Sequence, residues 1–208
     1  DERTRRRNES AFDDYWLVPK PMNGASERDL SIELLGHTYN LPVMIGPTGL
    51  SGLFWPGGEL ATARAAASAG TGFCLSHGSV CTLEALADTN SHPRWMQVFL
   101  YRDRPFTEEL VRRAVAANYD GIVLTIDNQL LGKRERDLAN GFTIPPEFSF
   151  RQYAAMLGKA KWWWRMRGEL RRITFGNYVR PGKVEDIKQL AARMAELLDP
   201  SLTWKDVD

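Results

Sequence analysis

The chain has 208 residues, of which 43% are hydrophobic and 25% charged, proportions that are typical of a globular protein. Its 27 basic and 26 acidic residues leave a net charge of +1, so any attraction to nucleic acid or to an anionic membrane must be local. No run of about 18 apolar residues predicts a membrane-spanning helix, and two cysteines cannot make a disulfide framework.

Strand-like and helical patterns alternate along the first 127 residues. Short apolar runs predict strands at 43–45, 73–75, 95–100 and 121–126. Between them, alanine-rich or amphipathic stretches predict helices at 59–69, 82–88 and 106–118. This order predicts parallel strands that are joined by right-handed helical crossovers.

Two architectures share this order of elements, the open doubly wound sheet and the (β/α)8 barrel. An open sheet usually carries a GxGxxG or P-loop motif, and the "GPTGLSG" at 46–52 fits neither. We therefore expect the α/β class and a (β/α)8 (TIM) barrel. Because a closed barrel needs about eight strands, residues 1–208 are expected to form one domain containing the first four β/α units. The opening "DERTRRRNES" lacks a Met, and we expect further residues before it.

The alternation of elements stops after Asp127. Residues 128–182 form a long excursion that is rich in Arg, Trp and Pro. An amphipathic pattern then predicts a helix at 184–198, and "LTWKDVD" at 202–208 reads as the start of another helix. Cys74 lies in an apolar run and is expected to be a buried thiol, which favours a reducing, cytoplasmic location.

Small and polar residues follow each predicted strand. These strand ends carry Pro47, Thr48, Gly49, Ser76, Gln97, Phe99, Thr125 and Asp127. Parallel α/β folds bind ligands at this edge, and hydroxyls, an amide and an uncovered backbone suit a flat heteroaromatic ligand. Ser and Thr are also common simply because strands turn there, but four strand ends together favour a ligand site.

Arg134 follows the fourth strand in the charged run "KRERD". A guanidinium near a strand end can clamp a substrate carboxylate, because its fork matches two oxygens. The composition of the run alone favours the alternative, a solvated charged turn. The spacing of His, Cys and carboxylates matches no metal site, and no metal is expected.

Five segments together carry a resemblance to a known family. They are "DERTRRRNESAF", "IGPTGLSGLFWPGGELATARAAASAG", "LSHGS", "WMQVF" and "VLTIDNQLLGKRERDLANGFTIP". In this order they resemble the FMN-dependent 2-hydroxy-acid dehydrogenase and oxidase family, and its (S)-mandelate dehydrogenase branch in particular. The resemblance covers nearly all of this chain but only about the first half of a typical member. It implies a (β/α)8 barrel with FMN at the C-terminal mouth.

The resemblance also implies roles for the strand-end residues. The backbone at Pro47, Thr48 and Gly49 would lie against the flavin N5 side, because the ring must approach backbone without an intervening side chain. The flavin ring would receive hydrogen bonds from Ser76, Gln97 and Thr125. In the catalytic pair, Arg134 would hold the substrate carboxylate and Asp127 would orient the histidine base. Phe99 would face the substrate.

Three positions depart from or divide the family pattern. Phe99 stands where the family has a substrate-facing tyrosine, so the site loses one donor. His77 replaces a small residue next to Ser76; a neutral packing role is expected, and it is not the family's base. Gly49 follows the dehydrogenase pattern, whereas oxidases usually carry Ala at this position. Gly is associated with poor reaction of the reduced flavin with oxygen, so Gly49 favours a dehydrogenase.

The implied function is FMN-dependent oxidation of a mandelate-like 2-hydroxy acid to the 2-keto acid. The family's histidine base, second arginine, N1 lysine and phosphate-binding loop are not among these residues. The isolated chain is therefore expected to be inactive and to need the remaining half of the barrel, in the same or a companion chain. The alternatives are a 2-hydroxy-acid oxidase or L-lactate dehydrogenase of the same family, and a non-catalytic half-barrel that binds a ligand or partner. Family members commonly form tetramers.

The excursion carries a basic, Trp-rich stretch. Residues 151–172 hold seven basic residues against one acidic residue, with three consecutive tryptophans at 162–164. This composition suits an anionic membrane interface, and we expect residues 151–180 to attach a cytoplasmic protein peripherally to the cytoplasmic membrane. The alternative of equal weight is a basic solvated face whose tryptophans pack on the barrel. Single-stranded nucleic acid fits less well, and no nucleic-acid partner is expected.

Overall fold

The computed structural model describes residues 2–24, 26–89, 93–127, 132, 135–141, 150, 158–169, 173–178 and 198–207. Its centre is a three-stranded parallel sheet in the order β3-β4-β5. The strands are β3 (Phe73–Leu75), β4 (Arg94–Phe99) and β5 (Gly121–Thr125). These bounds confirm three of the four predicted strands to within one residue.

The first predicted strand, at 43–45, is wrong as a strand. Ile45 forms only an isolated parallel bridge to Phe73, with hydrogen bonds from Ile45 N to Gly72 O (3.0 Å) and from Cys74 N to Ile45 O (2.9 Å). Pro42 and Pro47 flank the segment and have no N–H to donate, which limits the ladder to this short stretch. The segment still lies beside β3, where the prediction placed it.

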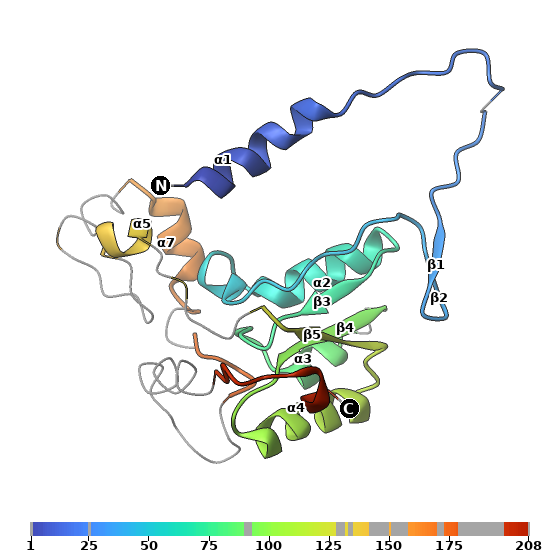
Figure 1. The fold of residues 1–208 in the computed structure, drawn as a ribbon. Coiled ribbons are helices and arrows are strands. Elements are labelled where there is room, and N and C mark those ends of the chain that lie inside the picture. The colour runs from blue at the N-terminus through green and yellow to red at the C-terminus, as the bar shows by residue number, and fades with distance from the viewer. Residues whose placement is uncertain are drawn as a thin grey trace.

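Three helices pack on one another and on the sheet. They are α2 (Gly58–Ser68), α3 (Leu83–Ala87) and α4 (Arg104–Ala116), with α2 contacting β3, α4 contacting β4 and α3 lying between the two helices. Figure 1 shows α2 beside β3, with α3 and then α4 following it along the sheet. All three confirm the predicted helices within two residues.

Local signals set the ends of these helices. The Thr82 side chain accepts a hydrogen bond from Ala85 N (3.1 Å) and caps the start of α3, and Asp103 does the same for α4 through Phe106 N (3.2 Å). Gly70 has a φ of +67° just after α2, a conformation that glycine adopts without strain and that ends the helix.

The core lies between the sheet and the helices. The register pairs Leu75 with Met96 and Val98 with Leu124, so these side chains share the face that the helices cover. Leu75, Met96 and Val98 are buried there against Leu83, Leu86 and Leu110. The alternate residues of the strands, Gln97 and Thr125 among them, face the other side.

Arg94, at the start of β4, ties two helix ends together although it is buried. Its Nη1 donates to Ala87 O (3.2 Å) at the end of α3, and its Nη2 donates to Ala117 O (2.8 Å) at the end of α4. A cation at helix C-termini is favourable because the last carbonyls have no partner within the helix. The guanidinium also lies 5.4 Å from the centre of the Tyr119 ring.

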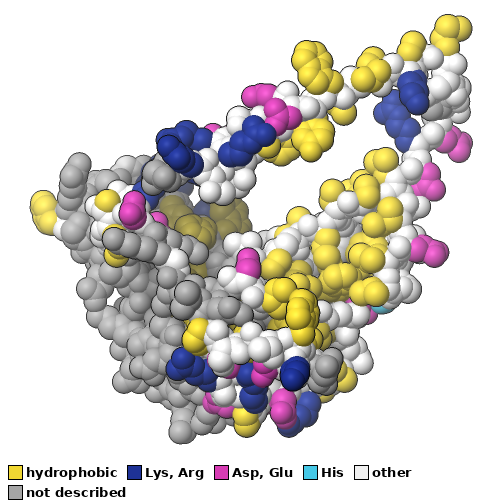
Figure 2. Space-filling view, viewed as in Figure 1, with side chains coloured by type: hydrophobic (Ala, Val, Ile, Leu, Met, Phe, Trp, Pro, Cys, Tyr) yellow, Lys and Arg dark blue, Asp and Glu magenta, His cyan; other side chains and the backbone are white. Residues whose placement is uncertain are grey.

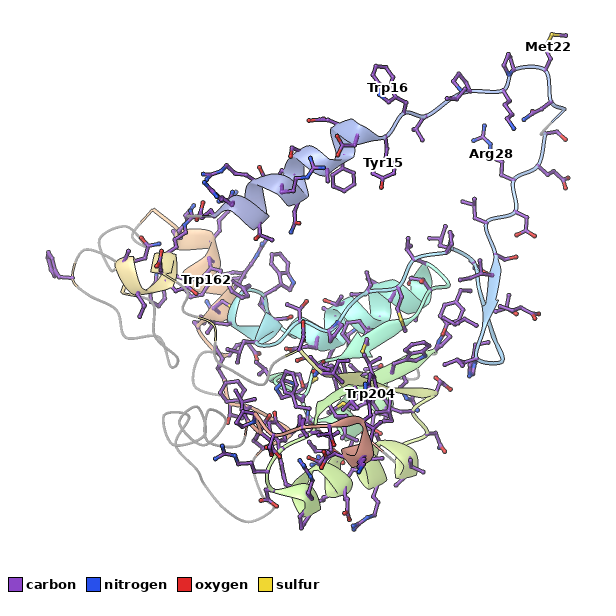
Figure 3. All side chains as sticks on the ribbon, viewed as in Figure 1. Tyr15, Trp16, Met22, Arg28, Trp162 and Trp204 are labelled. Carbon is purple, nitrogen blue, oxygen red and sulfur yellow. The ribbon has the colours of Figure 1, made fainter. Side chains whose placement is uncertain are left out.

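The chain before Gly46 adds two elements that the sequence patterns did not predict. One is the exposed helix α1 (Arg3–Ser10), followed by a short 3-10 turn, η1 (Ala11–Asp14). The other is a hairpin of β1 (Ile32–Leu34) and β2 (His37–Tyr39), whose two turn residues both have positive φ. Figure 3 shows Tyr15, Trp16 and Met22 on the extended stretch between them, away from the sheet.

The described parts of the excursion after β5 contain two short helices, α5 (Glu135–Ala139) and α7 (Ala160–Met166). Residues 184–197 of the predicted last helix lie outside the described residues. Leu198 forms an antiparallel bridge to Tyr101. The expected start of a further helix is a 3-10 turn, η4 (Trp204–Asp206), with a capping box between Thr203 and Asp206.

Apolar side chains are exposed at both edges of the sheet. Ile122 and Ile126 are exposed at the β5 edge, and Val43 and Ile45 at the other. Figure 2 shows hydrophobic side chains gathered over the sheet in this view. Such edges are expected for part of a barrel, where a neighbouring strand would cover them. Within the described ranges, no helix has the length and apolar character needed to cross a membrane.

Candidate functional site

The C-terminal ends of the strands bring Gln97 and Thr125 into direct contact. Gln97 Nε2 donates a hydrogen bond to Thr125 Oγ1 over 2.8 Å. The register explains this contact, because Phe99 pairs with Thr125, so Gln97 and Thr125 point to the same face one pleat apart. The predicted amide and hydroxyl therefore form one polar cluster at this edge.

Ser76 and Gly49 lie side by side on two neighbouring loops. Leu50 N donates to Gly78 O (3.1 Å), and Gly78 N donates to Ser76 Oγ (3.2 Å), which holds the loop after Ile45 against the loop after β3. A Cβ placed on Gly49 would lie 3.1 Å from Gly78 O and 3.6 Å from Ser76 Oγ. The Gly49 backbone can therefore lie this close to the loop at Gly78 because glycine has no side chain.

A buried carboxylate also joins these two loops, and the sequence patterns did not indicate it. Glu59 Oε1 accepts hydrogen bonds from Ser51 N (2.9 Å) and Val80 N (3.2 Å). From sequence alone, a Glu in the first turn of a helix is expected to be exposed and to interact with the helix dipole. Here Glu59, 2% exposed, instead fixes the relative position of the two loops.

His77 is buried behind the polar cluster. Its ring lies 4.3 Å from the Phe99 ring, edge to face, and its Nδ1 lies 2.6 Å from Gln97 Oε1. Burial lowers the pKa of His77 to about 4, so the ring is neutral near pH 7. This agrees with the neutral packing role expected for it.

The remaining predicted site residues make fewer contacts that define a site. Pro47 and Thr48 are exposed before Gly49, Phe99 is half-buried beside His77, and Asp127 is exposed two residues beyond Thr125. Arg134 lies outside the described residues. The structure therefore places Gly49 next to Ser76 and Gln97 next to Thr125, and the separate roles expected for Asp127 and Arg134 stay predictions.

The chemistry of this edge fits a flat ring with hydrogen-bond acceptors along one side. The edge offers the amide of Gln97, the hydroxyl of Thr125 and an exposed backbone at Thr48 and Gly49. Across the described ranges, no three His, Cys, Asp or Glu side chains are grouped to hold a metal ion.

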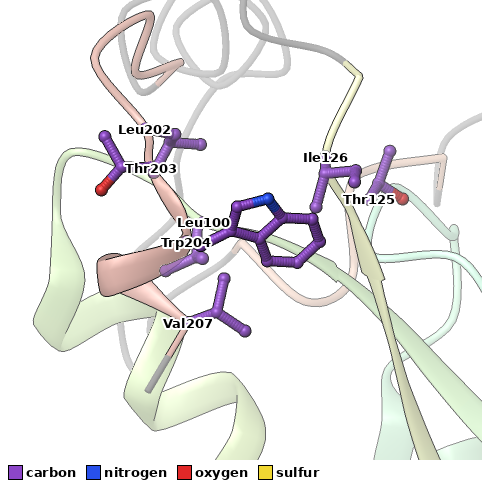
Figure 4. A pocket seen from close by; sticks show the side chains of 7 residues that line it. All are labelled: Leu100, Thr125, Ile126, Leu202, Thr203, Trp204 and Val207. Carbon is purple, nitrogen blue, oxygen red and sulfur yellow. The ribbon is translucent and has the colours of Figure 1, made fainter.

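A small cavity next to β5 adjoins this cluster at Thr125. Its volume is about 160 Å³, and its lining is apolar apart from two threonines. It is lined by Leu100, Thr125, Ile126, Leu202, Thr203, Trp204 and Val207 (Figure 4). The Trp204 indole lies between the C-terminal segment and the end of β5, so the cavity marks how that segment packs on the sheet.

The chain resembles proteins about twice its length. It is 33% identical over 208 residues to 2-hydroxyacid oxidase 1 of Homo sapiens and 34% identical over 208 residues to glycolate oxidase 1 of Zea mays. These matches cover 100% of this chain but 51% and 50% of the relatives, so the chain spans about half their length.

Solved structures agree with this comparison. The crystal structure of the monotopic membrane protein (S)-mandelate dehydrogenase superposes with a TM-score of 0.88 at 32% identity, covering 96% of this chain and 53% of that one. A mandelate oxidase structure superposes with a TM-score of 0.72 at 28% identity, covering 96% and 48%. The expected (β/α)8 architecture, present here as part of a barrel, is thereby confirmed.

One sequence family accounts for the whole chain. Its pattern matches residues 1–208, from the exposed helix α1 through the parallel sheet to the C-terminal turn. The chain belongs to the family of FMN-dependent dehydrogenases.

Proposed function

We propose that the complete protein oxidises a 2-hydroxy acid to the corresponding 2-keto acid with FMN, and that this chain supplies half of the active site. The observation that carries the proposal is the Gln97–Thr125 cluster beside the close-packed Gly49 loop, in a chain of this family. Bound FMN would supply the chemistry by accepting a hydride equivalent from the substrate carbon.

The residues of this chain would bind and orient. Gln97, Thr125 and Ser76 would donate hydrogen bonds to the edge of the flavin ring, and the backbone at 47–49 would lie against it. Arg134 would anchor the substrate carboxylate through two parallel hydrogen bonds. Asp127 would orient the histidine base. That base is expected in the other half of the barrel and not in this chain.

Two positions favour a dehydrogenase that acts on a bulky, mandelate-like substrate. Phe99 lines the edge with an apolar ring that accommodates aromatic substrates better than a hydroxyl would. Gly49 leaves the loop without the alanine that family oxidases usually carry. The named relatives keep 2-hydroxy-acid oxidase as the second candidate, with L-lactate dehydrogenase as a third.

Turnover by the complete, FMN-reconstituted protein tests this proposal. We expect flavin absorbance, reduction by mandelate faster than by lactate or glycolate, and little hydrogen peroxide in air. An Arg134→Met variant should raise KM strongly while FMN stays bound, and Arg136→Met, in the exposed helix α5, is the matched control. A protein that binds no FMN, or that no 2-hydroxy acid reduces, would contradict the proposal.

We further propose that residues 151–180, within the excursion 128–182 of the single domain 1–208, attach the protein to an anionic membrane surface. Trp164, in the described part of this segment, is 67% exposed, and Phe54 and Trp55, in the loop before α2, are 65% and 53% exposed. Arg165 lies over the Trp55 ring at 4.6 Å, and the Trp162 indole N–H donates to Phe54 O (3.1 Å).

These contacts join α7 to the loop before α2 in one cationic, aromatic surface, on which Figure 3 places Trp162. A shallow groove of about 530 Å³ runs between the two and includes Lys159 and Lys161. Exposed aromatics beside cations favour the interface of an anionic bilayer, and the mandelate dehydrogenase relative is described as monotopic.

Co-sedimentation with liposomes tests the membrane proposal. The complete protein should pellet with anionic vesicles more than with neutral ones, and replacing residues 151–180 by a short polar linker should abolish the difference. Equal pelleting of both forms would overturn it. Light scattering on the same samples would check the homo-tetramer that we propose for the complete enzyme.

A further inference from the structure

The Gln97 side chain lies between His77 on one side and Thr125 on the other. Gln97 Oε1 is 3.2 Å from His77 N and 2.6 Å from His77 Nδ1. On its other side Gln97 Nε2 donates to Thr125 Oγ1 over 2.8 Å. Gln97 and His77 are 3% and 7% exposed, so water does not substitute for these contacts.

This arrangement fixes the direction of the Gln97 amide. Turning the amide over would place Nε2 against the backbone N–H of His77, with two donors facing each other. With the amide as found, Oε1 accepts from the backbone N–H, and the short contact to Nδ1 requires that this nitrogen carry a hydrogen. A neutral ring holds one such hydrogen, which leaves Nε2 without one.

The surroundings of the ring support this assignment. His77 Nε2 is buried and has no hydrogen-bond partner within the described part of the chain, as suits a nitrogen without a hydrogen. Aromatic rings hold the imidazole in place, with ring centres at 4.3 Å for Phe99, 5.7 Å for Tyr178 and 6.2 Å for Tyr101. The imidazole therefore cannot rotate without disturbing this cluster.

The consequence concerns what the cluster can offer a ligand. With Oε1 occupied by two donors, the second N–H of Gln97 remains available, and it can only donate. Thr125 Oγ1 accepts from Gln97, so its own hydrogen is also available for donation. Two donors on one edge select the acceptor atoms of a ring, such as carbonyl oxygens and an unprotonated ring nitrogen.

We propose that His77 is a positioning residue: it fixes the Gln97 amide so that Gln97 and Thr125 both donate to the acceptor edge of the flavin. The inference rests on the proposed function, since it takes the ligand to be FMN. A donor pair stabilises the electron density that reduction adds to that edge. Removing the imidazole donor would leave only the backbone N–H of His77 to hold Gln97 Oε1, so the amide would be held less firmly, which weakens both FMN binding and the ease of flavin reduction.

Two substitutions separate the hydrogen bond from the packing, in the complete FMN-binding protein. His77→Phe keeps an aromatic ring but loses the Nδ1 donor, whereas His77→Asn places an amide N–H near the Nδ1 position but loses the ring. We expect His77→Phe to raise the FMN dissociation constant roughly three- to ten-fold, the effect of about one net hydrogen bond, and to lower the flavin midpoint potential. His77→Asn should keep both values close to those of the unchanged protein.

The reverse order, with His77→Asn the weaker binder or His77→Phe unchanged, would overturn the proposal. Imidazole nitrogen NMR on the unsubstituted protein without FMN gives a second readout that needs neither variant nor cofactor. A hydrogen on Nδ1 supports the positioning role, and a hydrogen on Nε2 refutes it. Because this measurement does not depend on flavin, failure of the protein to bind FMN would count against the proposed function alone.

Discussion

Asn177 caps the first turn of α3 from 94 positions further along the chain, because its Oδ1 accepts a hydrogen bond from Leu83 N at 2.9 Å. Its Nδ2 donates to Ser79 Oγ (3.0 Å), and Gly176 N donates to Ser79 O (2.9 Å). The returning end of the excursion therefore holds the loop that carries Ser76 and His77. The geometry of the candidate site depends on a segment that is remote in sequence.

We predict that Asn177→Ala destabilises the protein by about 2 to 3 kcal/mol, since it leaves the buried Leu83 N without an acceptor and removes the hydrogen bond to Ser79 Oγ. Ser79→Ala should cost less, and the double variant should cost less than the sum because the two side chains share a hydrogen bond. Urea unfolding of the three variants checks this. A cost for Asn177→Ala below about 0.5 kcal/mol, the range of ordinary surface changes, would contradict the prediction.

Glu59 offers a matched pair of substitutions. Glu59→Ala removes the acceptor shared by Ser51 N and Val80 N, and we expect a loss of roughly 2 to 4 kcal/mol of unfolding free energy. Glu59→Gln keeps an oxygen that can accept from both amides and should lose much less. Denaturant midpoints measure both variants, and equal losses would mean that the carboxylate charge, not the acceptor, is what matters.

The sequence predicted those parts of the fold that local patterns encode. The strands β3, β4 and β5 follow from short apolar runs, and α3 begins at Thr82 because a hydroxyl at that position caps the helix. The convergence of Gln97 and Thr125 also follows, because parallel strands end at one edge. These predictions needed no knowledge of distant contacts.

The contacts of Asn177, Glu59 and His77 could not be predicted in this way. Each joins segments that local periodicity treats separately, and an Asn or Glu in a polar stretch looks like any exposed residue. The hairpin of β1 and β2 did leave a signal, a two-residue Leu35-Gly36 turn between short strands. The strand expected at 43–45 forms only a single bridge, because Pro42 and Pro47 on either side of it cannot donate hydrogen bonds to a ladder.

The two cysteines are predicted to resist alkylation in the folded protein. Burial raises the thiol pKa of Cys74 and of Cys81 to about 12, so at pH 8 only about one molecule in 10⁴ carries either thiolate. Iodoacetamide followed by peptide mass spectrometry should label neither site in buffer and both in urea. Rapid labelling of Cys74 in buffer would show that β3 opens far more often than its packing implies.

We predict that the ion pairs between Arg104 and the C-terminal segment are lost at acidic pH. Its Nη2 lies 3.0 Å from Asp199 Oδ2 and 2.8 Å from Asp206 Oδ1, which anchors residues 198–207 to the start of α4. Hydrogen bonds from Ser201, with a smaller effect of Arg104, lower the pKa of Asp199, and hydrogen bonds from Thr203, with Arg104, lower that of Asp206. Both carboxyl groups start from a value of 3.8.

A lowered pKa means that, as the pH falls, these carboxylates take up protons in the unfolded chain at a higher pH than in the folded chain. The stabilisation from these carboxylates is therefore fully present above pH 3.8 and is lost as the pH falls through the lower folded values. Arg104→Gln should lower the urea midpoint at pH 6, and the difference from the unchanged protein should shrink as the pH falls below 3.8. Arg112→Gln, which breaks only the exposed pair with Glu108, should change neither midpoint. A deficit of Arg104→Gln that stays constant with pH would show that lost packing, and not charge, is responsible.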